Sequence, residues 1–281
     1  TTVTWDASLT ADTLSLNGKS APQPALERVA THLDYLRERL SINSHASVTS
    51  HNTFPAGTGI ASSASAFAAL TLAAVTASGE TLSKRELSTI ARLGSGSASR
   101  SIPAGFVEWY TADTHEASYA ETIAAPYHWD LVDLIAIVSD QHKRTTSSSG
   151  HTTAQTSDLQ NARVEGAQQR LDTVRQAILE RDFSTFADVV EEDSNLMHAV
   201  MMTSKPPLFY WKPTTLTIME DIRIWRSEGL NVCYTLDAGP NVHCICVRDD
   251  APAVRERLEK LSGILEIREA TVGRAAHIIT E

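Results

Sequence analysis

Two loops rich in glycine and serine in the first half of the chain have the composition of anion-binding sites. The first, residues 55–63, reads Pro-Ala-Gly-Thr-Gly-Ile-Ala-Ser-Ser and leads into an alanine-rich segment. Glycines let a backbone approach a ligand closely, and the first turn of a helix offers unpaired N–H groups at the positive end of its dipole. The Gly-Lys-Ser/Thr ending of a Walker loop is missing, and an ordinary turn before a tightly packed helix is the alternative. The candidate phosphate-binding residues are Pro55, Gly57, Gly59, Ala61, Ser62 and Ser63.

The second loop, residues 94–100, has the same composition and adds a guanidinium group. An arginine can hold a carboxylate or a phosphate through two parallel hydrogen bonds. A solvated surface arginine is the alternative interpretation. Ser95, Gly96, Ser97 and Arg100 are the candidate residues of this loop.

A carboxylate follows an apolar strand in the second half of the chain. Asp237 comes directly before Ala-Gly-Pro-Asn, and because Gly-Pro-Asn already supplies a turn, the turn does not need Asp237. An ionised carboxylate at the end of a strand can orient a hydroxyl group and accept its proton, as in phosphoryl transfer. A further motif, Asp193-Ser194-Asn195 with His198, has helical spacing, and we interpret it as a buried polar network that braces the site.

The elements that must position these residues are helices and strands in both halves of the chain. Alternation and apolar runs predict strands at 1–5, 14–18, 45–51, 105–109, 131–138, 231–237, 242–248 and 264–270. The second of these closes into an Asn17-Gly18 turn. Helical periodicity and capping signals predict helices at 22–40, 61–77, 83–94, 159–180, 183–200, 214–228 and 251–262. The polar segment 139–157 is expected to be a long loop. The second half thus has the order β-α-β-β-α-β of a ferredoxin-like (split βαβ) domain. The fold class is α+β, with lobes at 1–126 and 127–281 and a cleft between them as the expected site.

Composition excludes several classes of function. The net charge of −10, from 34 acidic and 24 basic residues, argues against nucleic acid as a partner. No apolar run approaches the length of a membrane helix, so a membrane partner is not expected. Three cysteines suit free thiols in a reducing compartment, and we expect a cytoplasmic protein. No protein-bound metal site is expected, because Cys244 and Cys246, predicted to face opposite sides of a strand, lack metal-ligand spacing.

Four segments, in this order and spacing, resemble the mevalonate diphosphate decarboxylase family of the GHMP kinase superfamily. The segments are 54–64, then 94–101 with 105–109, then 193–199, then 237–241. The resemblance implies a two-lobed GHMP kinase-like fold, with an N-terminal lobe like ribosomal protein S5 and a ferredoxin-like C-terminal lobe. It also implies a homodimer, and a reaction in which ATP and Mg²⁺ phosphorylate the 3-hydroxyl of a 5-phosphorylated mevalonate. Loss of that phosphate and of CO₂ then gives an isopentenyl product.

By the same resemblance, each candidate loop takes a role. The loop at 55–63 would hold the ATP phosphates, and Asp237 would contact the 3-hydroxyl as base or orienter. Arg100 would bind the substrate carboxylate, with Ser95 and Ser97 placing the substrate. Ser147 and Ser148 would lie at its phosphorylated end.

The chain departs from the family pattern at three places. The segment that carries a substrate-binding lysine is missing before Thr1, so a truncated N-terminus is expected. Ser148 stands where bacterial members often have an arginine, which suits a substrate with one phosphate fewer, and His151 replaces the usual methionine. Phosphomevalonate and diphosphomevalonate therefore both remain candidate substrates. A mevalonate 3-kinase and a non-catalytic binding module are the alternative functions.

Overall fold

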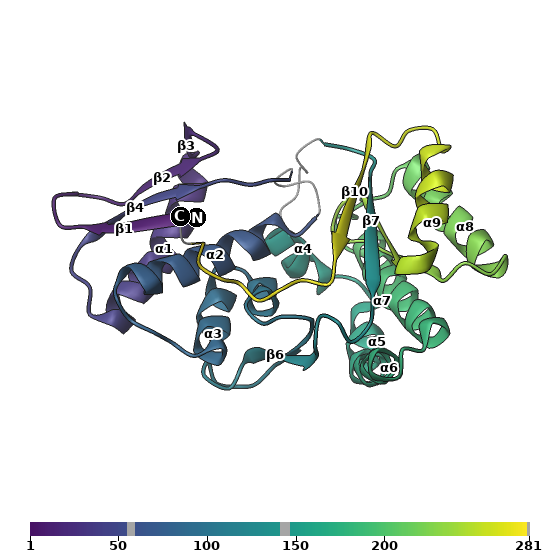
Figure 1. Ribbon diagram of the computed structural model, residues 1–281, viewed down its shortest axis with the longest axis horizontal. Coiled ribbons are helices and arrows are strands. Elements are labelled where there is room, and N and C mark those ends of the chain that lie inside the picture. Colours follow the sequence, from purple (N-terminus) through teal and green to yellow (C-terminus); the bar gives the residue numbers. More distant parts are fainter. Residues whose placement is uncertain (55–59, 141–146, 280–281) are drawn as a thin grey trace. The chain divides into compact units, whose positions relative to one another are not determined.

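The computed structural model describes residues 1–54, 60–140 and 147–279, and the chain divides into two units (Figure 1). The first unit contains Thr1–Ala56, Ala61–Ala125 and Arg274–Glu281, and the second contains Gly57–Ile60 and Pro126–Gly273. The return of the C-terminal segment to the first unit differs from the lobe expected at 127–281. Its physical basis is a backbone hydrogen bond from Ala276 N to Ile102 O, 3.1 Å long.

A four-stranded sheet forms one layer of the first unit. Its strands are β1 (Thr2–Asp6), β2 (Thr13–Leu16), β3 (Lys19–Ser20) and β4 (His45–Ser50), in the order β1-β4-β2-β3. β1 pairs antiparallel with β4, whereas β2 pairs parallel with β4, because the connection between them contains a helix. Asn17 and Gly18 both have positive φ and form the predicted tight turn between β2 and β3.

Helices and a hairpin complete the first unit. They are α1 (Gln23–Leu40), α2 (Ser62–Ala77), α3 (Lys84–Gly94), the 3₁₀ helix η1 (Gly96–Ser101) and the antiparallel pair β5 (Phe106–Tyr110) and β6 (Tyr119–Ala124). The predicted capping box begins α3. The Ser83 hydroxyl accepts from Glu86 N (3.2 Å), and Glu86 Oε2 accepts from Ser83 N (2.9 Å). The sequence did not predict β6.

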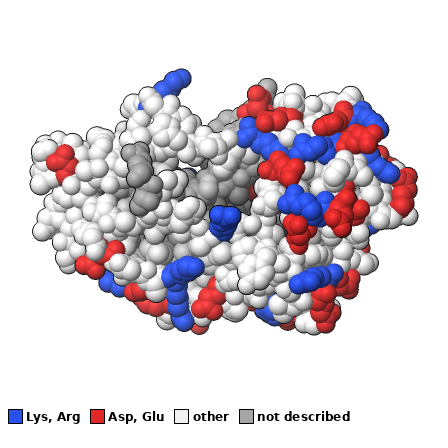
Figure 2. Space-filling model, viewed as in Figure 1, with Lys and Arg blue, Asp and Glu red and all other residues white. Residues whose placement is uncertain are grey.

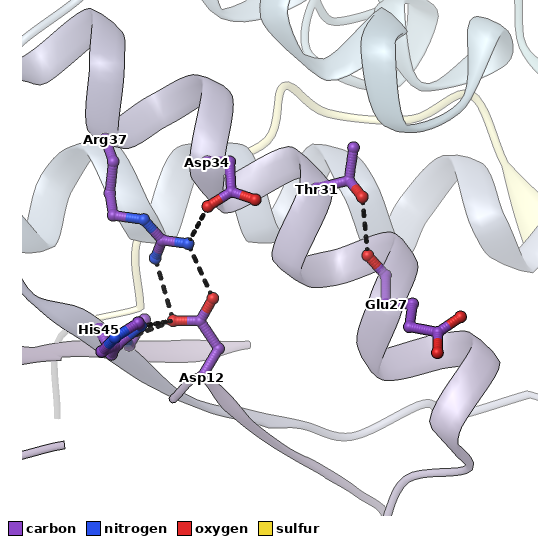
Figure 3. Close-up of polar contacts among 7 residues, drawn as sticks. Asp12, Glu27, Thr31, Asp34, Arg37 and His45 are labelled. Carbon is purple, nitrogen blue, oxygen red and sulfur yellow. Dashed lines mark hydrogen bonds and ion pairs between the residues drawn. The ribbon is translucent and has the colours of Figure 1, made fainter. Parts of the chain in front are cut away.

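Asp12 ties the start of β2 to α1 and β4 (Figure 3). Its Oδ1 and Oδ2 accept from the two terminal nitrogens of Arg37, at 3.0 and 2.9 Å, and Oδ1 also accepts from Ala46 N at 2.8 Å. Arg37 contacts Asp34 as well, and His45 Nδ1 lies 3.6 Å from Asp12 Oδ1. Burial raises the pKa of Asp12. The hydrogen bonds from Arg37 and Ala46 lower it by a larger amount, so the net pKa of Asp12 is below its ordinary value. Asp12 is therefore an ionised anchor within the first unit.

The second unit is built on an antiparallel sheet in the order β10-β7-β9-β8. The strands are β7 (Leu131–Ile137), β8 (Val232–Thr235), β9 (Val242–Val247) and β10 (Glu266–Thr271). In chain order this is the 4-1-3-2 arrangement, with the first strand in the interior, so the expected ferredoxin-like topology is present. Alternate residues of the strands form a core with α8 and α9. Figure 1 shows these two helices on one face of the sheet.

Cys244 and Cys246 correct one expectation. Both are fully buried and belong to that single core cluster, because residues two apart on a strand share a face. Burial raises the pKa of the Cys246 thiol to about 12. All three cysteines are free.

Six α-helices accompany the sheet in the part of this unit that the structure describes. They are α4 (Ser147–Ala154), α5 (Gln160–Glu165), α6 (Ala167–Glu180), α7 (Phe183–Thr203), α8 (Pro213–Ser227) and α9 (Ala251–Glu259). The expected loop at 139–157 is wrong for 147–154, which form α4. The helix expected at 159–180 is two helices, separated at Gly166.

The two edges of this sheet are protected differently. α7 accepts hydrogen bonds from the outer edge of β8, where Glu191 Oε1 bonds to Tyr234 N (3.3 Å). On β10, Glu269 forms ion pairs with Arg248 (3.0 Å) and Arg255 (2.9 Å), within the charged area over β10 and α9 that Figure 2 shows. A covered or charged edge does not pair with strands of other chains.

Candidate functional site

The predicted phosphate-binding helix begins where the sequence places it. α2 starts at Ser62, and Ala61 before it has left-handed geometry (φ 55°, ψ 30°). Because Ala61 has no side-chain acceptor, it cannot cap the amides of the first turn. Ser62 and Ser63 are partly exposed there. A helix N-terminus with hydroxyl groups beside it is suited to an anion. Pro55, Gly57 and Gly59 lie outside the described residues.

A hydroxyl contact joins this helix to the second candidate loop. Ser63 Oγ lies 3.1 Å from Ser95 Oγ, across 32 positions in the sequence. Ser95 is the residue between α3 and η1, so the end of one helix, the start of another and the first turn of α2 meet at this point. The structure thus brings together a predicted phosphate-binding residue and a predicted substrate-binding residue within the first unit.

Close packing fixes the path of the second loop. A Cβ atom at Gly94 would lie 1.9 Å from the buried ring of Phe67, so α3 can end against α2 only with glycine at this position. A Cβ atom at Gly96 would lie 3.3 Å from the indole of Trp109. The Ser99 hydroxyl donates to Gly96 O (2.8 Å) and closes the turn. Arg100 is exposed on η1, and Ser97 is partly exposed.

Asp237 lies on a turn that is held from several sides. Its carboxylate is exposed, whereas Leu236 before it is buried in the core. Leu236 N donates to Ser194 Oγ on α7 (3.1 Å), and Thr215 Oγ1 on α8 donates to Pro240 O (2.7 Å). Asn241, fully buried, accepts from Val138 N and Ser139 N at 2.8 and 3.0 Å through Oδ1. The turn therefore presents an exposed carboxylate on a rigid backbone.

Two residues of the motif on α7, Ser194 and Asn195, bond to this strand and turn, whereas Asp193 does not belong to the predicted buried network. Asn195 hydrogen-bonds to the Tyr234 hydroxyl (3.0 Å), in addition to the Ser194 contact. His198 is 1% exposed, and burial lowers its pKa to about 4, although backbone hydrogen bonds at Leu236 and Asp237 act in the opposite direction. Its ring packs against those of Tyr210 and Trp211. Asp193 is half-exposed and instead pairs with Arg170, at 3.0 Å.

A cavity of about 240 Å³ lies beside the Asp237 turn within the second unit. Ala238 forms part of its wall, with Gly150 of α4 and Arg163 of α5. Met197, Val200, Met201 and Tyr210 supply the apolar part of the lining. Sequence reasoning missed Arg163, because a lone arginine on a short helix carries no motif.

Ser147 and Ser148 are at the start of α4, and their side chains are outside the described part of the structure. The predicted residues are thus divided between the units. Ala61, Ser62, Ser63 and Ser95 to Arg100 belong to the first, and Asp237 with the start of α4 belongs to the second.

Comparison with known families accounts for both units. Residues 1–120 match the diphosphomevalonate decarboxylase-like N-terminal domain, and residues 133–277 match the mevalonate 5-diphosphate decarboxylase C-terminal domain. This chain belongs to the diphosphomevalonate decarboxylase family. The predicted family is therefore confirmed.

Individual relatives agree with this assignment. A diphosphomevalonate decarboxylase of Candida albicans is 38% identical over 256 residues, which cover 86% of this chain and 71% of the relative. One of Debaryomyces hansenii is 38% identical over 248 residues, covering 82% of this chain and 64% of the relative.

Solved structures confirm the fold class. Mevalonate diphosphate decarboxylase from Staphylococcus aureus has a TM-score of 0.92 at 32% identity, covering 97% of this chain and 83% of that one. A structure described as MDDEF in complex with MVAPP, AMPPCP and magnesium has a TM-score of 0.90 at 33% identity, covering 97% and 84%. The two-lobed α+β prediction and the predicted activity class, an ATP-dependent carboxy-lyase of the mevalonate pathway, are confirmed by these family members.

Proposed function

We propose that this chain transfers the terminal phosphoryl group of ATP to the 3-hydroxyl of a 5-phosphorylated mevalonate. Loss of that phosphate together with CO₂ then yields the isopentenyl product. The observation that carries the proposal is the 3.1 Å contact between Ser63 and Ser95, because it joins the two loops to which the reaction assigns its two reactants.

In this proposal the first unit binds the charged groups of both reactants. The first turn of α2, at Ala61, Ser62 and Ser63, holds the ATP phosphates together with the loop that precedes it. Ser95 and Ser97 position the mevalonate, and the guanidinium of Arg100 holds its carboxylate. Fixing a carboxylate and a phosphate in adjacent loops replaces an encounter of two free molecules by a single oriented complex.

Asp237 acts on the reacting hydroxyl. As a base or orienter it accepts the proton of the 3-hydroxyl while that oxygen attacks the terminal phosphorus atom. After Asp237 has released this proton to solvent, positive charge develops at C3 as the phosphate leaves, and the ionised carboxylate stabilises it. The braced turn supports this role, because a rigid carboxylate needs no rearrangement during the reaction.

The donor groups of the chain fit ATP with Mg²⁺. Backbone amides and serine hydroxyls are the usual partners of phosphate oxygens. No group of three or more His, Cys, Asp or Glu side chains among the described residues is arranged to hold a metal ion. Mg²⁺ in phosphoryl-transfer sites takes most of its ligands from phosphates and water and only one or two from carboxylates, so it does not require such a group. When bound, Mg²⁺ neutralises charge on the phosphates.

The number of phosphates on the substrate is a separate question. Ser148, in place of an arginine, favours phosphomevalonate, whereas the names of the relatives favour diphosphomevalonate. We propose to compare kcat/KM for the two substrates. Equal values would remove the argument from Ser148.

Replacing Asp237 tests the proposed chemistry. We expect Asp237→Asn to leave folding intact and to reduce kcat by orders of magnitude, since it removes a charge that acts mainly in the transition state. The measurements are CO₂ release and ATP consumption, with Asp158→Asn, another exposed carboxylate of the same unit, as control. Full activity of Asp237→Asn would contradict the proposal. A stable 3-phosphorylated product from the unaltered chain would instead indicate a kinase.

Two further proposals concern the state of the protein in the cell. Family likeness supports a homodimer, and light scattering would measure its molar mass. None of the described helices has the length and apolar character to span a membrane. We propose a cytoplasmic location, which fractionation of cells would test.

A further inference from the structure

The cavity of the second unit lies between two predicted contact points of the substrate. Ala238, which follows Asp237, forms part of its wall, and so does Gly150 of α4. The proposed function places the 3-hydroxyl of the substrate at Asp237. Family likeness places its phosphorylated end at Ser147 and Ser148, which begin α4. The cavity is therefore in position to receive the part of the substrate between these two groups.

The size and the lining of the cavity fit a short chain with a charged end. Its volume of about 240 Å³ is below the ~300–1,000 Å³ of sites for drug-sized ligands, so a whole nucleotide is not expected there. Met197, Val200 and Met201 of α7 supply apolar side chains to the wall. These side chains suit the two methylene groups between C3 and the 5-oxygen of a mevalonate.

Among the described residues that line the cavity, only Arg163 of α5 carries a charge. Its side chain is 28% exposed, and its Nη2 lies 3.5 Å from Asp193 Oδ2 on α7. Its Nε is buried and has no hydrogen-bond partner among the described residues. Because a guanidinium has five N–H donors, one loose ion pair leaves most of them for another anion.

A second arginine fixes the place of Arg163 in the fold. Arg170 Nη2 donates to the backbone oxygen of Arg163 (2.7 Å), and Arg170 Nε donates to Asp193 Oδ1 (3.0 Å). Asp193 thus pairs with both arginines, so two positive charges and one negative charge leave this cluster with one net positive charge. Of the three residues, only Arg163 lines the cavity.

We propose that this cavity is the subsite for the 5-phosphorylated end of the substrate, and that Arg163 binds its phosphate. The inference deepens the proposed function and rests on it, since that function supplies the ligand. Arg163 would then provide, from a different helix, the cation that position 148 lacks. A guanidinium can hold a phosphate through two parallel hydrogen bonds, which makes Arg163 a determinant of specificity for phosphorylated substrates.

The test is the binding of two probes to the full chain, mevalonate and 5-phosphomevalonate, which differ by one phosphate. Titration calorimetry would measure the Kd of each. Arg163→Gln removes charge-assisted hydrogen bonds, so we expect it to weaken the binding of 5-phosphomevalonate roughly tenfold, and that of mevalonate less than about twofold. Arg163→Lys keeps the charge without the fork of donors, and it should recover part of the loss.

Arg255→Gln is the matched control, because Arg255 belongs to the same unit, is 32% exposed and also pairs with a carboxylate, that of Glu269 (2.9 Å). Unchanged binding of 5-phosphomevalonate in folded Arg163→Gln would overturn the inference. An equal loss for mevalonate, or an equal effect of Arg255→Gln, would overturn it as well. The proposed function fails separately, if Asp237→Asn remains active.

Discussion

At the residue scale, the roles proposed for Ser63 and Ser95 lead us to expect that each hydroxyl affects the binding of a different reactant. Removing either hydroxyl loses hydrogen bonds worth about 1 kcal/mol each, or roughly a fivefold change in an equilibrium constant. We expect Ser63→Ala to raise KM mainly for ATP and Ser95→Ala to raise it mainly for the phosphorylated mevalonate. Steady-state kinetics with each substrate varied in turn would measure this.

Ser65→Ala is the matched control, since Ser65 is exposed on α2 and its hydroxyl donates to the backbone of Ser62 (3.1 Å). Equal effects of Ser63→Ala and Ser65→Ala on the KM for ATP would contradict the assigned role of Ser63.

Two buried histidines, His32 and His198, lead us to expect that the folded protein loses stability as the pH falls. Thr71 Oγ1 donates to Phe67 O (2.7 Å), so it accepts from His32 Nε2 (2.8 Å), and His32 Nδ1 is left buried without a partner among the described residues. Burial lowers the pKa of His32 to about 4, as it does for His198. Because the folded pKa is below the unfolded one, each contribution to stability is complete above pH 6.5 and is lost as the pH falls towards 4.

Between pH 7 and pH 5, we expect each of these histidines to reduce the free energy of unfolding by about 2 kcal/mol. Denaturant titrations at a series of pH values would show it. His32→Gln should make the pH dependence shallower even if it lowers stability at every pH, whereas His51→Gln, at an exposed position, should leave the slope unchanged. An unchanged slope in His32→Gln would contradict this account.

At the element scale, α2 and α3 pack closely because Gly94 has no side chain. A Cβ atom at Gly94 would overlap the ring of Phe67, which is 6% exposed and has little room to move. We expect Gly94→Ala to lower the free energy of unfolding by about 1–3 kcal/mol, as overpacking of a core does. Thermal or denaturant unfolding would measure it.

Gly273→Ala is the control, because a Cβ atom there would meet nothing within 4 Å. Equal stability of the two variants would show that α2 and α3 can separate without cost.

The sequence predicted those helix ends and turns that are determined by a few residues adjacent in the chain. Ser83 and Glu86 cap the N-terminus of α3 through hydrogen bonds within one turn. Asn17 and Gly18 form a hairpin turn because both residues tolerate positive φ. Strand β6 was missed, and its place depends on pairing with β5 rather than on its own pattern. Helix α4 was missed because its serines and threonines have low intrinsic helix preference.

The candidate site likewise contains residues that local sequence motifs predict and residues that only the folded chain brings together. Asp237 and the two loops were predicted as site residues because their residue types fit anions and hydroxyls. Arg163 was not predicted, since its place in the cavity wall depends on helices that meet only in the folded chain.

At the scale of the whole molecule, the two units have separate hydrophobic cores. One is formed by β1, β2, β4 and the helices α1 to α3, and the other by the second sheet with α8 and α9. Because each unit has its own core, a measured free energy of unfolding is to be assigned to one unit by substitutions such as Gly94→Ala.

The hydrogen bond between Ala276 and Ile102 connects residues separated by most of the second unit's sequence. Ala276 also packs against the core of the first unit. During synthesis on a ribosome, the N-terminal part of the chain emerges long before residue 276, so the first unit must wait for this segment while the second is being made. The last backbone contact of the first unit can therefore form only after the second unit has been synthesised.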